Sequence, residues 1–188
     1  MKKFFTTIKN IFSIEDLRIR ILNTIGFLII FRLGSYVVLP GIDPVILEAV
    51  GGQAQGIFGL LNTFLGGAFS RASIFALGIM PYISASIVIQ LMTVAVPYFQ
   101  KMQKEGESGR NRINQITRVL TIAITLAQSI GYLATSIPSE AIVIDPYLFR
   151  VSSMIILVSG TMFTMWLGEK ITDKGIGNGI SMLIMIGI

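Results

Sequence analysis

The sequence predicts an all-α protein that crosses a membrane several times. Of its 188 residues, 53% are hydrophobic and only 13% are charged, and the mean hydropathy is +0.75. A soluble domain carries about twice that share of charged residues. Apolar segments close to the roughly 20 residues needed to cross a hydrocarbon core recur along the chain. Helices are the elements that such segments form in lipid, because a helix satisfies its own backbone hydrogen bonds.

Four apolar segments are long enough to be membrane spans, at residues 21–39, 72–97, 119–137 and 151–168. A fifth, at 175–188, is still apolar at Ile188, so we expect an incomplete span and a chain that is either an incomplete protein or one half of a larger one.

Pro81 divides the second of these segments. Proline has no backbone N–H and is tolerated in the first turn of a helix. The sequence therefore predicts a helix that begins within residues 79–82 and ends near Val96. Residues 72–78 are expected to be non-helical or a separate short piece.

The glycine-rich segment at 56–70 is apolar enough to enter a membrane but too short to cross it. Two interpretations remain open, a re-entrant element and an amphipathic helix lying on the outer surface.

Basic residues indicate the orientation in the membrane. They concentrate before the first span, after the second and after the fourth. These three places hold Lys2, Lys3, Lys9, Arg18 and Arg20, then Lys101, Lys104, Arg110, Arg112 and Arg118, then Lys170 and Lys174. The positive-inside rule predicts that the N-terminus and the loops around Gly106 and Asp173 are cytoplasmic.

The composition argues against an enzyme. The sequence has no histidine and no cysteine, and the four complete spans contain no acidic residue. These absences remove the usual zinc ligands, Ser–His pairs and paired intramembrane aspartates. We therefore expect no catalysis, no metal and no cofactor. The basic residues do not gather on one soluble face, so we also expect no direct nucleic-acid binding.

Two further features favour structural roles. Arg32 is the charge inside a span, and we interpret it as reaching the outer headgroups or a carboxylate such as Asp43. The glycines of GEKITDKGIGNGIS, residues 168–181, lack phosphate-loop spacing, and they favour close backbone packing or a turn where the chain re-enters the membrane.

Four motifs together resemble the SecY family, whose members are subunits of the bacterial protein-translocation channel. They are GGAFSRASIFALGIMPYISASIVIQLM at 66–92, KEGESGR at 104–110, GTMFTMWLGEKIT at 160–172 and GIGNGIS at 175–181. The resemblance implies a SecY-like helical bundle of ten spans in two halves. Residues 1–188 match the N-terminal half, with spans one to four, the start of five and a re-entrant plug helix at about 56–70.

The resemblance also implies site residues. The pore ring is expected to include Ile79, Ile83, Ile180 and Ile184. The plug corresponds to the segment containing Phe58, Leu61, Phe64, Leu65, Gly66 and Gly67, although a fixed surface helix shares most of these features. The lateral gate is expected to include Ser84 and Gln128, whose polar side chains also fit ordinary packing between helices.

The function implied is a protein-conducting channel subunit that moves unfolded preproteins across the membrane and apolar segments into it. The implied partners are SecE, SecG, the SecA motor or the ribosome, signal sequences, preproteins and the lipid bilayer, and the implied location is the bacterial inner (plasma) membrane. Two alternatives stay open: half of a small-solute secondary transporter, and a truncated fragment without function.

Overall fold

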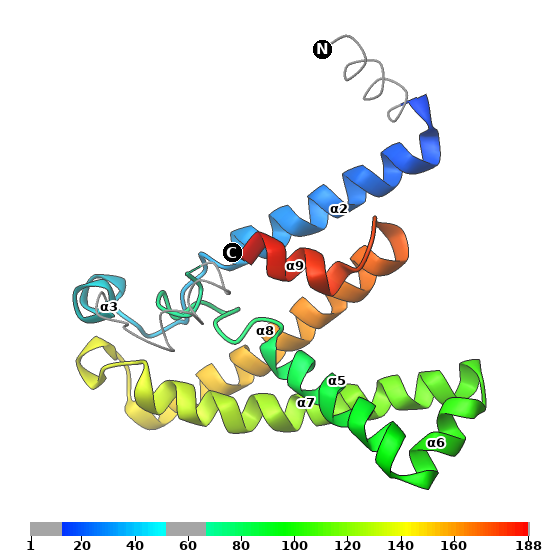
Figure 1. Ribbon diagram of the computed structural model, residues 1–188. Helices are drawn as coiled ribbons and strands as arrows, with labels where there is room; N and C mark the ends of the chain where they lie inside the picture. The colour runs from blue at the N-terminus through cyan, green and yellow to red at the C-terminus, as the bar shows by residue number, and fades with distance from the viewer. Residues whose placement is uncertain (1–12, 52–66, 188) are drawn as a thin grey trace.

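The structure is a computed structural model that describes residues 13–51 and 67–187, and within them the regular elements are helices (Figure 1). The helices are α2 (Glu15–Gly34), α3 (Pro44–Gly51), α5 (Met80–Ala95), α6 (Pro97–Lys104), α7 (Glu107–Thr135), α8 (Pro146–Lys174) and α9 (Gly179–Gly187), with a short 3-10 helix, η1 (Ser139–Ala141). β-Sheet pairing in the described ranges is limited to two isolated β-bridges.

Two of the described helices, α7 and α8, are long and apolar enough to cross a membrane. A third span is added if α5 and α6, which meet at an angle of 97°, are counted as one broken span. Helix α2 is not among these spans, because its first turns carry the charged residues Glu15, Asp16, Arg18 and Arg20. It also ends at Gly34, so the predicted span at 21–39 continues into non-helical backbone.

The predicted effect of Pro81 is confirmed. Helix α5 begins at Met80 with Pro81 in its first turn, and residues 67–79 before it form turns and one bridge. The helix ends at Ala95, where Val96 is extended (φ −110°, ψ 119°) and Pro97 follows. Proline disfavours helical backbone in the residue before it. The chain therefore turns sharply here and continues as α6.

Helices α7 and α8 extend well beyond the apolar segments that predicted them. Helix α7 begins at Glu107, inside the basic loop, and α8 begins at Pro146. The Asp145 carboxylate accepts hydrogen bonds from the N–H groups of Tyr147 and Leu148 and so caps the start of α8. Hydropathy detects only the part of a helix that lies in hydrocarbon, whereas the backbone hydrogen bonds continue through polar residues.

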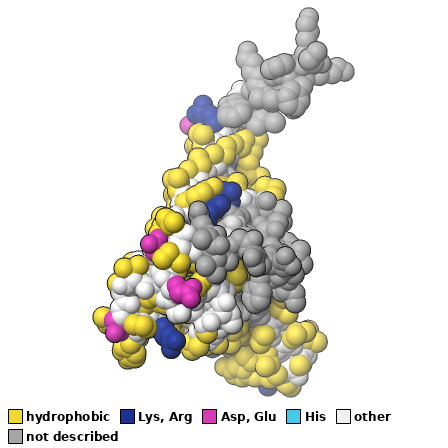
Figure 2. All heavy atoms as spheres, turned by 90° about the vertical axis from the view of Figure 1, so that its left-hand side faces the viewer, with side chains coloured by type: hydrophobic (Ala, Val, Ile, Leu, Met, Phe, Trp, Pro, Cys, Tyr) yellow, Lys and Arg dark blue, Asp and Glu magenta, His cyan; other side chains and the backbone are white. Residues whose placement is uncertain are grey.

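The basic connections lie toward one side of the molecule. In Figure 1 the start of α2, the α6 to α7 connection and the α8 to α9 turn lie toward the right, while α3 and the α7 to α8 connection lie toward the left. Figure 2 views the left-hand end of Figure 1 and shows hydrophobic side chains on its surface, with several charged side chains among them. Exposed hydrophobic residues include Leu22, Leu33, Leu91 and Ile155. Such a surface suits contact with lipid.

Irregular backbone at the left-hand end in Figure 1 is paired with other irregular backbone. The N–H of Leu39 donates to the Ala72 carbonyl (2.8 Å), and the N–H of Ile74 donates to the Val37 carbonyl (2.9 Å). The N–H of Asp43 donates to the Ala141 carbonyl at 2.9 Å. These bonds hold three connections together. They also satisfy backbone N–H and C=O groups that have no partner within a helix.

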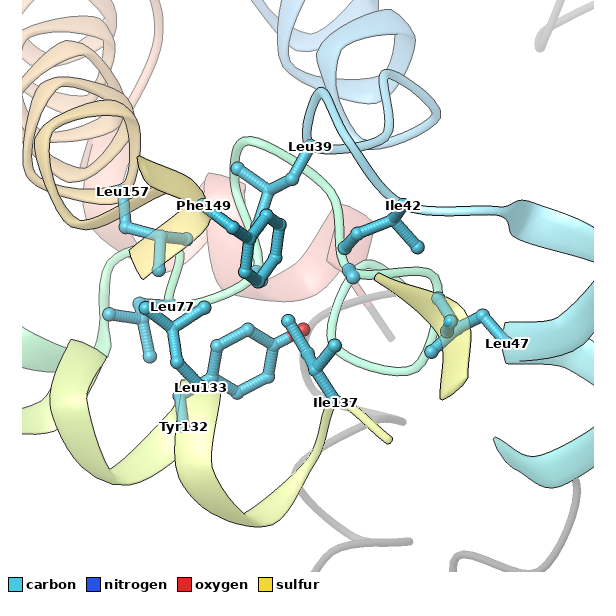
Figure 3. Close-up of a cluster of buried hydrophobic side chains, with 12 residues drawn as sticks. Leu39, Ile42, Leu47, Leu77, Tyr132, Leu133, Ile137, Phe149 and Leu157 are labelled. Carbon is cyan, nitrogen blue, oxygen red and sulfur yellow. The ribbon is translucent and has the colours of Figure 1, made fainter. Parts of the chain in front are cut away.

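A hydrophobic cluster lies beneath these connections (Figure 3). Its buried members include Leu39, Leu77, Tyr132, Phe149 and Leu157. They come from the segment after α2, the segment before α5, and helices α7 and α8. This cluster therefore joins elements that are distant in sequence.

Helix α8 approaches the segment before α5 closely at Gly160. A Cβ atom placed there would collide with the carbonyl oxygen of Ile74. Glycine is needed at this position because the helix surface and the neighbouring backbone are in direct contact.

We predict that Gly160→Ala lowers stability by about 1–3 kcal/mol, the usual cost of overpacking a tight site. The measurement is thermal unfolding of the purified protein in detergent. The matched control is Gly131→Ala in α7, where a Cβ meets nothing within 4 Å. That variant should be neutral or stabilised, because alanine is the better helix former. Equal melting temperatures for the two variants would contradict the assignment.

Candidate functional site

The four isoleucines predicted for the pore ring contribute to one hydrophobic cluster, and we call these four residues the collar: Ile79, Ile83, Ile180 and Ile184. Ile79 is a buried member of the cluster, 5% exposed. The other three are partly buried and pack against it. The structure thus places two pairs that are about 100 residues apart in sequence against one buried cluster.

The two pairs approach the cluster from different helices. Ile79 directly precedes α5 in helical conformation (φ −92°, ψ −5°), and the N–H of Ile83 donates to its carbonyl at 3.1 Å. Within the described residues, α5 contacts α6, α7 and α8, whereas α9 contacts α8 and α2. The two collar pairs are therefore linked through elements between them and not by direct packing of α5 on α9.

Helix α8 and an aromatic stack form the support behind the collar. Leu167 and Ile171 of α8 are fully buried in the same cluster. The rings of Phe31 and Phe75 are stacked at 5.8 Å, and Phe75 stacks on Phe163 at 5.8 Å. Large rigid rings contribute much buried apolar area. They tie α2, the segment before α5 and α8 into one unit around the collar.

The start of α9 is set by Asn178. Its side-chain oxygen accepts hydrogen bonds from the N–H groups of Ile180 (3.0 Å) and Ser181 (3.2 Å), which is an N-cap. The expectation of close backbone packing in the glycine-rich motif is confirmed at Gly179. A Cβ there would collide with the carbonyl oxygen of Gly168 in α8.

Most of the predicted plug lies outside the described residues. This applies to Phe58, Leu61, Phe64, Leu65 and Gly66. Gly67 is described, and it has positive φ (+80°) at the start of the turn-rich segment 67–79.

The two predicted lateral-gate residues lie on helices that contact one another, α5 and α7. Ser84 is half-buried, and its hydroxyl donates to the Met80 carbonyl of its own helix at 3.2 Å. Gln128 is exposed on α7. Among the described residues, no hydrogen bond joins these two side chains.

Sequence reasoning missed a hydrogen bond that anchors the first part of segment 67–79. The hydroxyl of Tyr132 donates to the Phe69 carbonyl at 2.7 Å, and the two rings meet edge to face at 4.8 Å. Tyr132 is buried. A tyrosine in an apolar run gives no sequence signal for such a bond, since its partner lies 63 residues away.

A ladder of hydroxyl groups on α7 also went unnoticed, although its spacing is visible in the sequence. Thr117, Thr121 and Thr125 are buried, and each donates to the carbonyl four residues earlier, at 2.7 to 2.9 Å. Threonines four residues apart share one helix face. Small side chains there allow neighbouring helices to approach closely.

Some charged side chains have identified partners. Arg118 of α7 and Glu169 of α8 form an ion pair, in which one guanidinium nitrogen donates to both carboxylate oxygens, at 2.9 and 2.7 Å. The guanidinium groups of Arg32 and Arg71 lie over the Tyr36 ring, at 5.6 and 4.6 Å from its centre. In the described part of the chain, no group of three or more acidic, histidine or cysteine side chains is suited to hold a metal ion.

Apolar helices of membrane-spanning length, connections paired at one end and a lipid-compatible surface define an all-α multi-pass membrane protein. A sequence model of the SecY family matches residues 73–188. The protein translocase subunit SecY of Escherichia coli (strain K12) is 52% identical over 182 residues, which cover 94% of this chain and 41% of that protein. The chain belongs to the SecY family.

Other relatives agree. Protein translocase subunit SecY of Buchnera aphidicola subsp. Schizaphis graminum is 51% identical over 195 residues, covering 100% of this chain and 44% of that protein. The chain thus spans less than half the length of both relatives. The fold is shared with Sec61 in the canine ribosome-channel complex from the endoplasmic reticulum, with a TM-score of 0.66 and 19% identity over 90% of this chain and 36% of that one.

We predict that cysteines replacing Ile83 and Ile184 are joined by a short bifunctional maleimide, because both side chains pack against the same buried cluster. The chain has no cysteine of its own, so no other thiol in it competes. A protease site inserted beside the exposed Gly106 separates the two positions, and the cross-link is measured as a product that stays intact after cleavage. The control pairs Ile83→Cys with Ile155→Cys, since Ile155 is 62% exposed on α8. Equal cross-linking of both pairs would contradict a common cluster.

Proposed function

We propose that this chain forms the N-terminal half of a protein-conducting channel that moves unfolded preproteins across the membrane and apolar segments into it. The observation that carries the proposal is membership of the SecY family, with relatives about half identical that are protein translocase subunits. In this proposal the membrane segments are those centred on α2, α5, α7, α8 and α9, and residues 56–70 act as the plug.

The collar supplies the physical mechanism. Branched aliphatic side chains close around an extended polypeptide and exclude water, but they make no strong specific bond to it. In the absence of a polypeptide, an apolar constriction resists ions because water leaves it. The partial burial of Ile83, Ile180 and Ile184 supports this role, because these side chains keep one side in the cluster and another available for contact.

Ser84 and Gln128 act at the lateral gate in this proposal. A hydrogen bond between helices in a membrane contributes about 0.6 kcal/mol on average. Attraction of that size permits α5 and α7 to be parted from neighbouring helices when an apolar signal sequence arrives. The exposure of Gln128 supports the proposal, since it leaves the amide available to a partner helix.

The channel performs no covalent chemistry and needs no cofactor in this account, so energy comes from partners. We propose SecA or the ribosome as the source of that energy, with SecE and SecG as neighbouring subunits. The chain lies in the bacterial inner (plasma) membrane with its N-terminus in the cytoplasm. Twelve basic residues in three connections support this orientation, and the start of α2, α6 to α7 and α8 to α9 gather toward one side in Figure 1.

The rival reading, half of a small-solute transporter, requires polar groups that converge at mid-membrane. The cluster that contains the collar is aliphatic and aromatic, which favours a polypeptide path. The curated relatives also carry the name of a protein translocase.

The direct test is to express the chain with and without a second polypeptide that supplies the remaining length of a SecY relative. The pair is reconstituted in vesicles with a motor and a labelled preprotein. Preprotein that becomes resistant to external protease only when both halves are present supports the channel. Absence of transport by a correctly assembled pair would count against it and would favour the fragment reading.

We predict that Ser84→Leu relaxes the requirement for a functional signal sequence. Loss of about 0.6 kcal/mol of gate attraction changes the open-to-closed ratio about threefold. The measurement is export of a precursor with a defective signal, and Gln128→Leu should act in the same direction. The control is Ser86→Leu, because the Ser86 hydroxyl accepts a bond from Gln90 of its own helix. Unchanged export of defective precursors in both gate variants would show that these residues serve only as packing.

A further inference from the structure

The turn between α8 and α9 determines where two of the four collar residues lie. Residues 175–178 form this turn, and Ile180 follows it almost at once. Gly177 has positive φ (+72°), so the turn uses backbone geometry that other residues rarely adopt. Its remaining polar groups need partners from elsewhere in the protein.

Helix α2 provides those partners. The Thr24 hydroxyl accepts a hydrogen bond from the N–H of Ile176 at 3.0 Å and donates to the Arg20 carbonyl at 2.8 Å. The Asn23 side chain donates to the Lys174 carbonyl at 3.4 Å, and the Arg20 guanidinium donates to the Gly175 carbonyl at 3.5 Å. Arg20, Asn23 and Thr24 lie on one helix face, because their spacing is i, i+3 and i+4.

The contact is also tight. A Cβ atom at Gly175 would lie 2.5 Å from the Thr24 hydroxyl oxygen, so the turn and the helix touch directly. Thr24 is only 7% exposed, so it is the buried residue of this set. The next buried residues along α2, Leu28 and Phe31, enter the cluster that contains the collar. One face of α2 therefore holds both the turn and the apolar support of the isoleucines.

We infer that Thr24 is a positioning residue for the collar, which it serves by fixing the start of α9 against α2. The inference rests on the proposed channel function. Helix α9 has a separate tie to α8, where the Thr172 hydroxyl accepts a hydrogen bond from the N–H of Gly179 at 2.9 Å. Loss of the Thr24 bond therefore leaves α9 helical and attached to α8. It frees the helix to move relative to α2, and Ile180 and Ile184 move with it.

Valine at position 24 keeps the shape of threonine and removes the hydroxyl. The Ile176 N–H then lacks its acceptor in a partly buried site, which shifts the balance between seated and displaced α9 by about tenfold. Thr24→Ser keeps the hydroxyl and should restore the seated position.

The experiment uses the assembled channel in sealed vesicles, with a single cysteine in place of Ile184 in this cysteine-free chain. The readout is the rate of reaction with a water-soluble, membrane-impermeant maleimide. We expect about tenfold faster labelling in Thr24→Val than in the parent and a near-parental rate in Thr24→Ser. Asn23→Ala removes the neighbouring donor and should accelerate labelling less, and it serves as the second variant if Thr24→Val assembles poorly.

The matched control is Thr121→Val in α7. Thr121 is fully buried, but its hydroxyl donates to a carbonyl of its own helix. A general loss of stability would make the two valine variants behave alike, whereas positioning predicts faster labelling in Thr24→Val alone. Parental labelling in Thr24→Val, or equal acceleration in Thr121→Val, overturns the inference. A separate result would show that the proposed collar itself is wrong. That result is the absence of a cross-link between Ile83→Cys and Ile184→Cys in a protein that keeps Thr24.

Discussion

The need to satisfy backbone hydrogen bonds within the protein governs this fold. In hydrocarbon an unpaired N–H or C=O costs several kcal/mol, so irregular backbone persists only where protein or a water-filled space supplies a partner. Here the segment after α2 pairs with the segment before α5 and with the backbone around η1. These bonds fix the position of the irregular residues 67–79. Ile79, which directly precedes α5, therefore has a defined place.

The same constraint explains why the sequence predicted some elements well and others poorly. Pro81 indicated the start of α5 because a proline restricts its own backbone. The ends of α2, α7 and α8 were harder to predict, because hydropathy indicates contact with lipid and not the position of the last helical hydrogen bond. The contact of Tyr132 with the Phe69 carbonyl depends on tertiary structure alone. No local pattern announces a bond to a carbonyl 63 residues away.

The candidate site could likewise be predicted only in part from the sequence. The pairs Ile79 with Ile83 and Ile180 with Ile184 have ordinary helical spacing, and their meeting in one cluster depends on helices that the spacing does not describe. The importance of Thr24 was also hidden, because an isolated threonine in an apolar helix usually bonds to its own backbone. Thr24 does so, and it accepts a bond from the α8 to α9 turn in addition.

In the proposed channel, helix α8 provides a firm core against which the collar residues could move. It contacts α2, α5, α7 and α9, and it carries the fully buried residues Leu157, Leu167 and Ile171. In the described residues α5 and α9 meet α8 but do not pack on one another. A small displacement of either helix against α8 therefore changes the separation of the two isoleucine pairs without opening the core. Polar contacts such as those of Thr24 suit this arrangement, because each is strong enough to set a resting position and weak enough to be exchanged.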